Sequence, residues 1–514
     1  MDQQMILEAF DLKSKGYYKQ AIELLYKVLA EEENNTEVLS EISTLYFLLN
    51  NYERSSYYAE KVLETEENNI VCLTNLCKIN YRTDKLEQAK ELAEKIYSLE
   101  KNQENLMLLL EILNKMGKYE EVTKYENEAE TENTVFEVAS AKYHLNNNIK
   151  DILDKIFSIR PDFSKALFLA GNYYYDKKDY DSAKKVFLNL IEQDKTFSDA
   201  YNKLGLIYLD NMELDKAEEC FLEALKLDNV SGIFNYNLGQ TYFLKGWLEE
   251  AKKYFTKAIY IEPENDEYRY SLAYLYYRKG DLEKAESELN KNYLPADILL
   301  YKIKAQQGDF ASAKNGLENL LKIYPNNELL CSSLANVYFN LDMFRQAKKL
   351  LVDLISKNPD MKDAHKLLCE ILIKINDLDD AEKYIKSFAE MYPKYISSYV
   401  LMAKLNYAKK DYDEVYEITQ KIIELDSNCA DGYYYNALAL FEQRDIDFAI
   451  ESLKKAISLD VNNADLYVKM GEFYQATGQL ENALAYITEA SEIDDSEKNR
   501  ELYKNMISLI RNKK

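Results

Sequence analysis

Residues able to carry out covalent or metal chemistry are few in this chain and stand far apart. It has two histidines, His144 and His365, and six cysteines. His365 and Cys369 are four residues apart, a spacing that places both on one face of a helix and could serve a metal ion or an activated thiol. We predict that Cys369 instead packs in the core, because it falls in a regularly spaced series of small residues.

Other motifs for catalysis or cofactor binding are missing from the sequence. Cys72 and Cys77 are five residues apart, whereas zinc sites use cysteine pairs with a gap of two residues. Neither phosphate-cradling pattern, G-x-x-x-x-G-K-[ST] or G-x-G-x-x-G, occurs. The prediction is therefore a protein that is not an enzyme and that has no catalytic residues, no metal and no cofactor.

Charge and hydropathy narrow the classes of partner. The net charge of −24 argues against nucleic acid, whose phosphates bind clustered lysine and arginine. The first residues lack the basic segment and apolar run of a secretory signal. No apolar stretch approaches the roughly 20 residues that cross a bilayer. Together with the scattered cysteines, these features predict a cytoplasmic protein with no membrane insertion.

The elements that position the side chains are predicted to be helices throughout. Only 13 Gly and 6 Pro interrupt 514 residues, and helix-forming residues recur along the whole chain. Alanines step by 34 residues from Ala183 to Ala285, and a second series steps by 34 from Ala313 to Ala483. The two series are 28 residues apart, and the prolines on either side show the same offset. One register therefore runs through the chain, with six residues missing near 290–295.

The repeated pattern resembles the tetratricopeptide repeat, whose 34 residues run W-x2-L-G-x2-Y, then A-x3-F, then P. Tyr201-x2-Leu204-Gly205-x2-Tyr208 followed by Ala217-x3-Phe221 fits it, with tyrosine in place of tryptophan. The resemblance implies two antiparallel helices per repeat, with small residues at positions 8 and 20 where the helices approach closely. Position 8 is held by Gly171, Gly205, Gly239, Ala273, Ala335, Cys369, Ala403, Ala437 and Gly471.

The predicted fold is an all-α superhelix of about fifteen such repeats. They begin near residues 2, 36, 70, 103, 130, 164, 198, 232, 266, 294, 328, 362, 396, 430 and 464. Irregular spacing at 103–163 and 290–295 predicts bends or hinges there. The predicted blocks are 2–163 (its last two repeats divergent), 164–293 and 294–497, with 498–514 as a capping helix that covers the last apolar face.

The resemblance also implies a binding groove, since first helices line the concave face of such superhelices and contact ligands at positions 2, 5, 9, 12 and 13. Tyrosine and arginine at these positions are typical of interface hot spots. Packing of these tyrosines on one another is the alternative. The candidate partner-binding residues are Asn202, Tyr236, Gln240, Phe243, Tyr270, Tyr274, Tyr277 and Arg278. A second set comprises Tyr434, Phe441, Glu442, Glu472 and Gln475.

The predicted function is a protein-protein interaction scaffold or adaptor whose groove binds partner proteins or peptides. Two alternatives stay open. One is a peptide-responsive regulatory protein, and the other is an accessory subunit of an enzyme or of a secretion or assembly complex. The fold alone does not choose among them.

Overall fold

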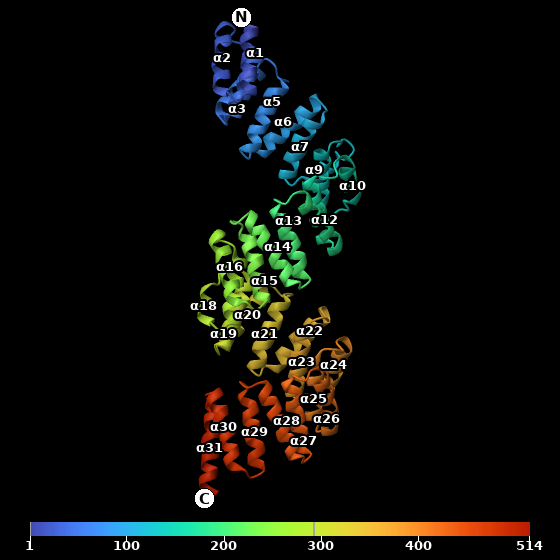
Figure 1. Cartoon of the computed structure of the whole chain (residues 1–514), viewed down its shortest axis with the longest axis vertical. Coiled ribbons are helices and arrows are strands. Elements are labelled where there is room, and N and C mark those ends of the chain that lie inside the picture. Colours follow the sequence, from blue (N-terminus) through green and yellow to red (C-terminus); the bar gives the residue numbers. More distant parts are fainter. Residues whose placement is uncertain (1, 291–292, 514) are drawn as a thin grey trace. The chain divides into compact units, whose positions relative to one another are not determined.

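The structure of the chain is a computed structural model that describes residues 2–290 and 293–513. Within these residues it contains thirty-one helices and no strand (Figure 1). Thirty helices pair into fifteen repeats, and α31 (Glu497–Lys513) follows them. The all-α prediction is therefore confirmed. Lys291 and Asn292 of the irregular stretch, and Lys514 of the predicted capping helix, lie outside the described residues.

The first helices of the repeats begin where the register predicts, except the fifth, which begins at Glu132 rather than at 130. Asparagine caps several of them, as at α3, where the Asn35 side chain accepts a hydrogen bond from the Val38 amide. The first helices are α1 (Asp2–Ser14), α3 (Thr36–Leu48), α5 (Ile70–Arg82), α7 (Gln103–Lys115), α9 (Glu132–His144), α11 (Ser164–Asp176), α13 (Ser198–Asp210), α15 (Gly232–Leu244), α17 (Asp266–Arg278), α19 (Leu294–Gln306), α21 (Glu328–Asn340), α23 (Lys362–Lys374), α25 (Ile396–Lys409), α27 (Ala430–Glu442) and α29 (Ala464–Ala476).

The second helices are more strongly amphipathic than the first, because each buries one face and exposes the other. Ala217, Phe221 and Ala224 are the buried residues of α14. The second helices are α2 (Tyr18–Glu31), α4 (Tyr52–Leu63), α6 (Leu86–Leu99), α8 (Tyr119–Thr123), α10 (Lys150–Ile159), α12 (Tyr180–Gln193), α14 (Leu214–Leu227), α16 (Leu248–Ile261), α18 (Leu282–Ser287), α20 (Phe310–Ile323), α22 (Phe344–Lys357), α24 (Leu378–Met391), α26 (Tyr412–Leu425), α28 (Ile446–Leu459) and α30 (Leu480–Ile493).

The chain divides into two compact units, residues 1–268 and 269–514, and the division falls within α17. Within each unit, consecutive helices pack against one another in chain order. The predicted blocks 2–163, 164–293 and 294–497 are a finer division and stay a prediction.

Each repeat turns from its first to its second helix through one residue in the left-handed conformation. In the seventh repeat this residue is Met212, and the Glu213 amide donates to the Tyr208 carbonyl at 2.8 Å. This bond spans six residues and satisfies a carbonyl at the end of the first helix. Glycine is preferred at such a position, yet most of these turns use another residue. The full series is Gly16, Asn50, Asp84, Gly117, Asn146, Lys178, Met212, Gly246, Gly280, Gly308, Asp342, Asn376, Lys410, Arg444 and Gly478.

Small residues at position 8 allow the paired helices to approach closely, as predicted. A Cβ atom added at Gly205 would lie 2.6 Å from Cε1 of Phe221 on the second helix. At Gly239 it would lie 2.7 Å from Cδ1 of Phe255. Phe221 is fully buried, so its ring has little room to move away. Cys369 also lies at position 8 and is fully buried, which confirms that it packs in the core.

The irregular spacing in the sequence corresponds to shortened second helices. Most second helices have 12 to 14 residues, as α4 and α14 do. By contrast, α8 has 5 residues, α18 has 6 and α10 has 10. Residues are therefore lost from the second helix while the first helix keeps its length. Bending or hinge motion at these repeats stays a prediction.

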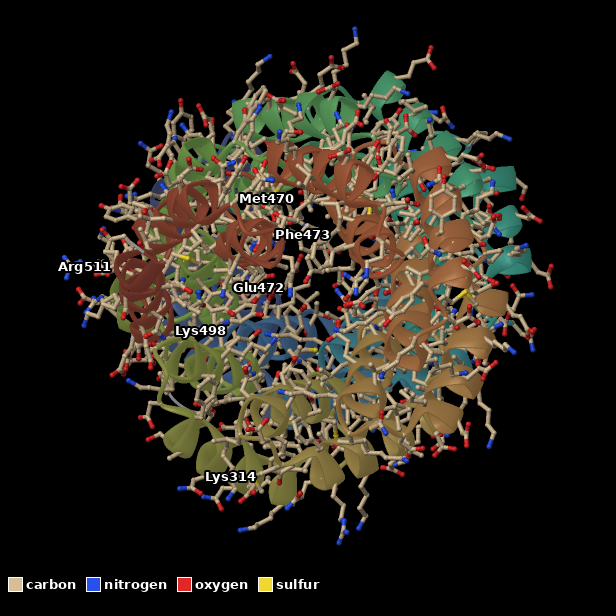
Figure 2. The ribbon with its side chains drawn as sticks, turned by 90° about the horizontal axis from the view of Figure 1, so that it is seen from below. Lys314, Met470, Glu472, Phe473, Lys498 and Arg511 are labelled. Carbon is tan, nitrogen blue, oxygen red and sulfur yellow. The ribbon has the colours of Figure 1, made fainter. Side chains whose placement is uncertain are left out.

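The helix at 497–513 packs on the last repeat, as the predicted capping helix would. Met506 of α31 is buried in one apolar cluster with Met470 and Phe473 of α29, and Leu502 and Ile510 pack against that cluster. Figure 2 shows Met470 and Phe473 on α29, whereas Arg511 of α31 points away from the molecule. The apolar face of α29 and α30 is therefore covered by α31.

Candidate partner-binding surface

Two of the predicted contact residues, Asn202 and Tyr236, are buried in the first unit. Asn202 is 6% exposed, and its side-chain oxygen accepts a hydrogen bond of 2.8 Å from Asn237 Nδ2. Tyr236 is 4% exposed, and its ring stacks on Tyr268 with centroids 4.7 Å apart. Both side chains therefore join neighbouring first helices to one another.

The half-buried Gln240 continues this network toward the surface. Its Nε2 donates to the Tyr236 hydroxyl at 2.5 Å, and that hydroxyl donates to Glu267 Oε1 at 3.0 Å. Phe243, one turn beyond Gln240, is also half-buried. Of the four predicted residues in this unit, Gln240 and Phe243 are the ones with side-chain surface left for a partner.

The predicted residues of the second unit form a row of aromatic rings along α17. The ring centroids of Tyr270 and Tyr274 are 6.2 Å apart, and those of Tyr274 and Tyr277 are 6.1 Å apart. Burial raises the pKa of the phenols of Tyr270 and Tyr277. Both phenols are neutral hydrogen-bonding groups at physiological pH, as any tyrosine is, and burial keeps them neutral to higher pH. All three rings are half-buried, and Arg278 at the end of the helix is exposed.

Tyr277 lies at the edge of a cleft formed by α17, α19, α20 and α21. The cleft has a volume of about 520 Å³, and its lining includes Lys302, Gln306, Asn336 and Asn340. These side chains stand at positions 9 and 13 of their repeats, and Tyr277 stands at position 12. Positions that the repeat pattern assigns to ligand contact are thus brought together in one cleft.

Lys302 is the cation of this cleft. Burial lowers the pKa of its ammonium group, because a charge is less well solvated there than in water. Among the ion pairs of residues 2–290 and 293–513 none involves Lys302. A partner carboxylate bound beside it would compensate for this lost solvation. Lys302 was not among the predicted contact residues, although its position 9 in the register could have identified it.

The second predicted set combines two half-buried rings with exposed polar side chains, since Glu442, Glu472 and Gln475 are all exposed. The rings of Phe441 and Phe473 stack with centroids 4.0 Å apart, and Phe473 is buried. Glu472, labelled in Figure 2, is an exposed side chain that pairs with Lys469 at 2.5 Å. Tyr434 is half-buried, and burial raises its pKa to about 12.

The cysteines and His365 are held in structural roles. Burial raises the pKa of the Cys77, Cys220 and Cys369 thiols to about 12, so they remain protonated and poorly nucleophilic. The His365 ring stacks on Phe388, and its Nε2 lies 3.0 Å from the Pro359 carbonyl oxygen. In the described part of the chain no three histidine, cysteine or acidic side chains are grouped as metal ligands.

Comparison with known families agrees with this architecture. Tetratricopeptide-repeat family models match residues 164–197, 198–229, 234–265, 254–287, 304–360, 342–389, 437–478 and 464–497. The chain belongs to the tetratricopeptide-repeat family, a class of interaction scaffolds. No curated protein matches the sequence. None of the helices in the described residues has the length and apolar composition needed to cross a membrane.

Several solved structures match the chain at low identity. The Cut9–Hcn1 hetero-tetramer of the APC/C contains a chain 13% identical, with a TM-score of 0.45, and the match covers 85% of this chain and 96% of that one. A tetratricopeptide-repeat protein of Parabacteroides merdae is 20% identical (TM-score 0.38, covering 54% and 98%). A thermophilic repeat protein of Thermus thermophilus is 19% identical (TM-score 0.33, covering 35% and 99%).

Proposed function

We propose that the chain is a non-enzymatic adaptor that binds protein or peptide segments along its first helices. The observation that carries this proposal is the cleft of α17, α19, α20 and α21, where an aromatic ring, an ammonium group and side-chain amides line one hollow. Phenol and amide groups can hydrogen-bond a peptide backbone, and a half-buried ring supplies apolar contact. A cytoplasmic location is part of the same proposal.

The contact residues in the second unit are proposed to be Tyr270, Tyr274, Tyr277 and Arg278. Tyr277 lines the cleft, and the other rings extend from it along α17. In the first unit, Gln240 and Phe243 are proposed as contacts. Asn202 and Tyr236 are proposed to act through them as positioning residues, because they are buried and hydrogen-bonded to neighbouring helices.

The test is affinity capture with the full chain and two matched double variants. Y274A/Y277A removes two rings of the row along α17. Y260A/Y324A removes two exposed tyrosines, one on the second helix α16 and one at the C-cap of α20, 87% and 45% exposed, and serves as the control. Retained proteins are identified by mass spectrometry, and their affinities are then measured by titration with purified partner.

Partners that bind the wild type and the control but are lost with Y274A/Y277A would support the groove of α17. A loss of 2 kcal/mol or more, about thirtyfold in Kd, is typical of an aromatic hot spot. Partners held equally by all three proteins would overturn this choice of surface. Far-UV circular dichroism should be the same for all three, because alanine is a stronger helix former than the tyrosine it replaces.

A further inference from the structure

A second and larger cleft lies between two second helices of the C-terminal unit, α26 and α28. Its volume is about 1230 Å³, and the intervening first helix α27 forms its floor. From α27 it is lined by Tyr433, Asn436 and Leu440, whereas the predicted groove residues of that helix are Tyr434, Phe441 and Glu442. The cleft therefore uses a different face of α27 from the groove of the first helices.

The floor of this cleft is fixed by buried hydrogen bonds. Asn436 is 6% exposed; its oxygen accepts from Thr419 Oγ1 at 3.2 Å, and its nitrogen donates to Ser452 Oγ at 3.0 Å. These bonds connect α27 to both second helices. A binding surface held in this way loses little entropy when it is occupied.

The walls expose two aromatic side chains. Phe448 is 66% exposed and Tyr416 is 39% exposed, and both line the cleft. Exposed phenylalanine beside a hollow gains free energy when a partner covers it, by about 25 cal/mol for each Å² of apolar surface removed from water. The cleft therefore offers an apolar anchor point.

The charge around this anchor is strongly negative. Six carboxylates line the cleft, against Lys454 and Lys455. Across the described residues the ion pairs include none of these eight side chains. The six carboxylates belong to Asp411, Asp413, Glu414, Glu417, Asp445 and Glu451.

Stabilisation of helix N-termini accounts for some of these carboxylates but not for all of them. Asp413 and Glu414 are in the first turn of α26, and Asp411 and Asp445 are N-cap residues, where a negative charge stabilises the helix. Glu417 and Glu451 lie beyond the first turns of α26 and α28. Their charge therefore has no role in capping.

The corresponding cleft between second helices of the N-terminal unit is different. Its volume is about 650 Å³, and it is lined by two carboxylates, Glu219 and Glu223, and two lysines, Lys226 and Lys257. Acidic excess is therefore not a property of every such cleft in this acidic chain. The α26–α28 cleft has six carboxylates to two lysines, and the adjacent cleft of α24 and α26, which shares Asp411, Glu414 and Glu417, has five carboxylates to three lysines.

We propose that the α26–α28 cleft binds a lysine- and arginine-rich segment of a partner protein, with an apolar side chain of that segment packed on Phe448. The carboxylates on both walls attract the cationic side chains, and the aromatic anchor fixes the position of the segment. This site is independent of the groove of the first helices.

The test uses a fluorescein-labelled peptide, Lys-Lys-Leu-Lys-Lys-Phe-Leu-Lys-Lys, and a control peptide with glutamate in place of each lysine. Fluorescence anisotropy measures binding to the full chain. The site variant is E414Q/E417Q/E451Q. The control variant, E53Q/E60Q/E64Q, changes the net charge by the same amount at exposed residues of the N-terminal unit.

We expect the site variant to raise Kd for the cationic peptide about tenfold and the control variant to raise it less than twofold. F448A should raise Kd about fivefold, and added salt should weaken binding. Y274A/Y277A should leave binding unchanged, which separates this site from the groove. Equal weakening by both triple variants would overturn the proposal, because the peptide would then be responding to net charge alone. No effect of F448A would also overturn it.

Discussion

The two helices approach closely both in repeat seven (198–231) and in repeat ten (294–327), but the small residue that allows this lies on the first helix in one repeat and on the second helix in the other. In repeat seven the small residue is Gly205 on the first helix, and it faces Phe221 on the second. In repeat ten the first helix carries the large residue, Tyr301, and the second carries Gly316, where an added Cβ would overlap the tyrosine ring. Close approach therefore requires one small residue per pair, and either helix can supply it.

The two arrangements differ in how well the large ring is covered. Phe221 is fully buried, whereas Tyr301 is half-buried. The ring of repeat seven should therefore contribute more to stability than the ring of repeat ten, because more of its apolar surface is removed from water.

The largest effect is expected from removing each ring. F221A should lower the free energy of unfolding by about 3–5 kcal/mol, because it leaves a cavity in a fully packed site. Y301A should cost about half as much. Urea unfolding followed by circular dichroism would measure the change in the free energy of unfolding, and hydrogen exchange would locate the affected repeat. The exposed-surface control, Y260A, should remain within about 0.5 kcal/mol of wild type. Equal costs for F221A and Y301A would contradict the comparison.

Adding a methyl group to each small residue should have the next largest effect. G205A should cost about 1–3 kcal/mol, since the new Cβ would overlap the fully buried ring of Phe221. G316A should cost less, because the half-buried Tyr301 ring that it would overlap has more room to move aside. The double variant Y301A/G316A should then cost less than the sum of its single changes, and so should F221A/G205A. The same unfolding measurements give these coupling energies. Additive costs would show that the ring and the small residue do not share one site.

Much of this fold follows from the sequence because its packing is local and periodic. Position 8 identified Gly205 and Gly239 as close contacts, and the register placed the start of α13 at residue 198. The exchange of the large and the small residue between the two helices of repeat ten was not predicted. Tyr301 breaks the small-residue series at position 8, and Gly316 lies at position 23, for which the pattern requires no small residue.

The binding surface was less predictable than the fold. A position in the repeat determines which face of a helix a residue occupies, but not whether a neighbouring side chain covers it. Tyr236 occupies a groove position and yet is buried by stacking on Tyr268. Lys302 was not predicted because tyrosine and arginine are the residue types typical of interface hot spots, whereas the proposed role of Lys302 depends on a cleft formed by three consecutive first helices and the second helix α20.

Alkaline pH should lower the stability of repeats seven and ten, because in each of them one carboxylate accepts a hydrogen bond from a buried tyrosine. The Tyr338 hydroxyl donates to Glu318 of repeat ten, and the Tyr242 hydroxyl donates to Glu218 of repeat seven, both at 2.8 Å. Burial, followed by the hydrogen bond to the carboxylate, raises the pKa of Tyr338 to about 12 and that of Tyr242 further. In the unfolded chain the phenol ionises near pH 10. Its stabilising contribution is therefore complete below pH 10 and is lost as the pH rises through about 12.

Absorbance at alkaline pH, which reports phenolate, together with circular dichroism would follow this loss. Y338F should cost about 1 kcal/mol at neutral pH, because Glu318 loses its donor. The difference between Y338F and wild type should shrink as the pH rises above 10. A difference that is constant with pH would contradict the assignment of the raised pKa to this pair.

The smallest effect concerns the turns of the same two repeats. Repeat ten turns through Gly308, with φ of 87°, whereas repeat seven turns through Met212, with φ of 60°. A side chain in this conformation costs about 1–2 kcal/mol, and Met212 is 62% exposed, so removing its side chain loses little packing. M212G should therefore stabilise the chain by about 0.5 kcal/mol after the greater entropy of glycine in the unfolded state is deducted. G308A should instead destabilise it by about 1 kcal/mol. If M212G lowers the urea midpoint, the entropy of the unfolded chain outweighs the relief at this turn, and the two turns differ for a reason other than strain.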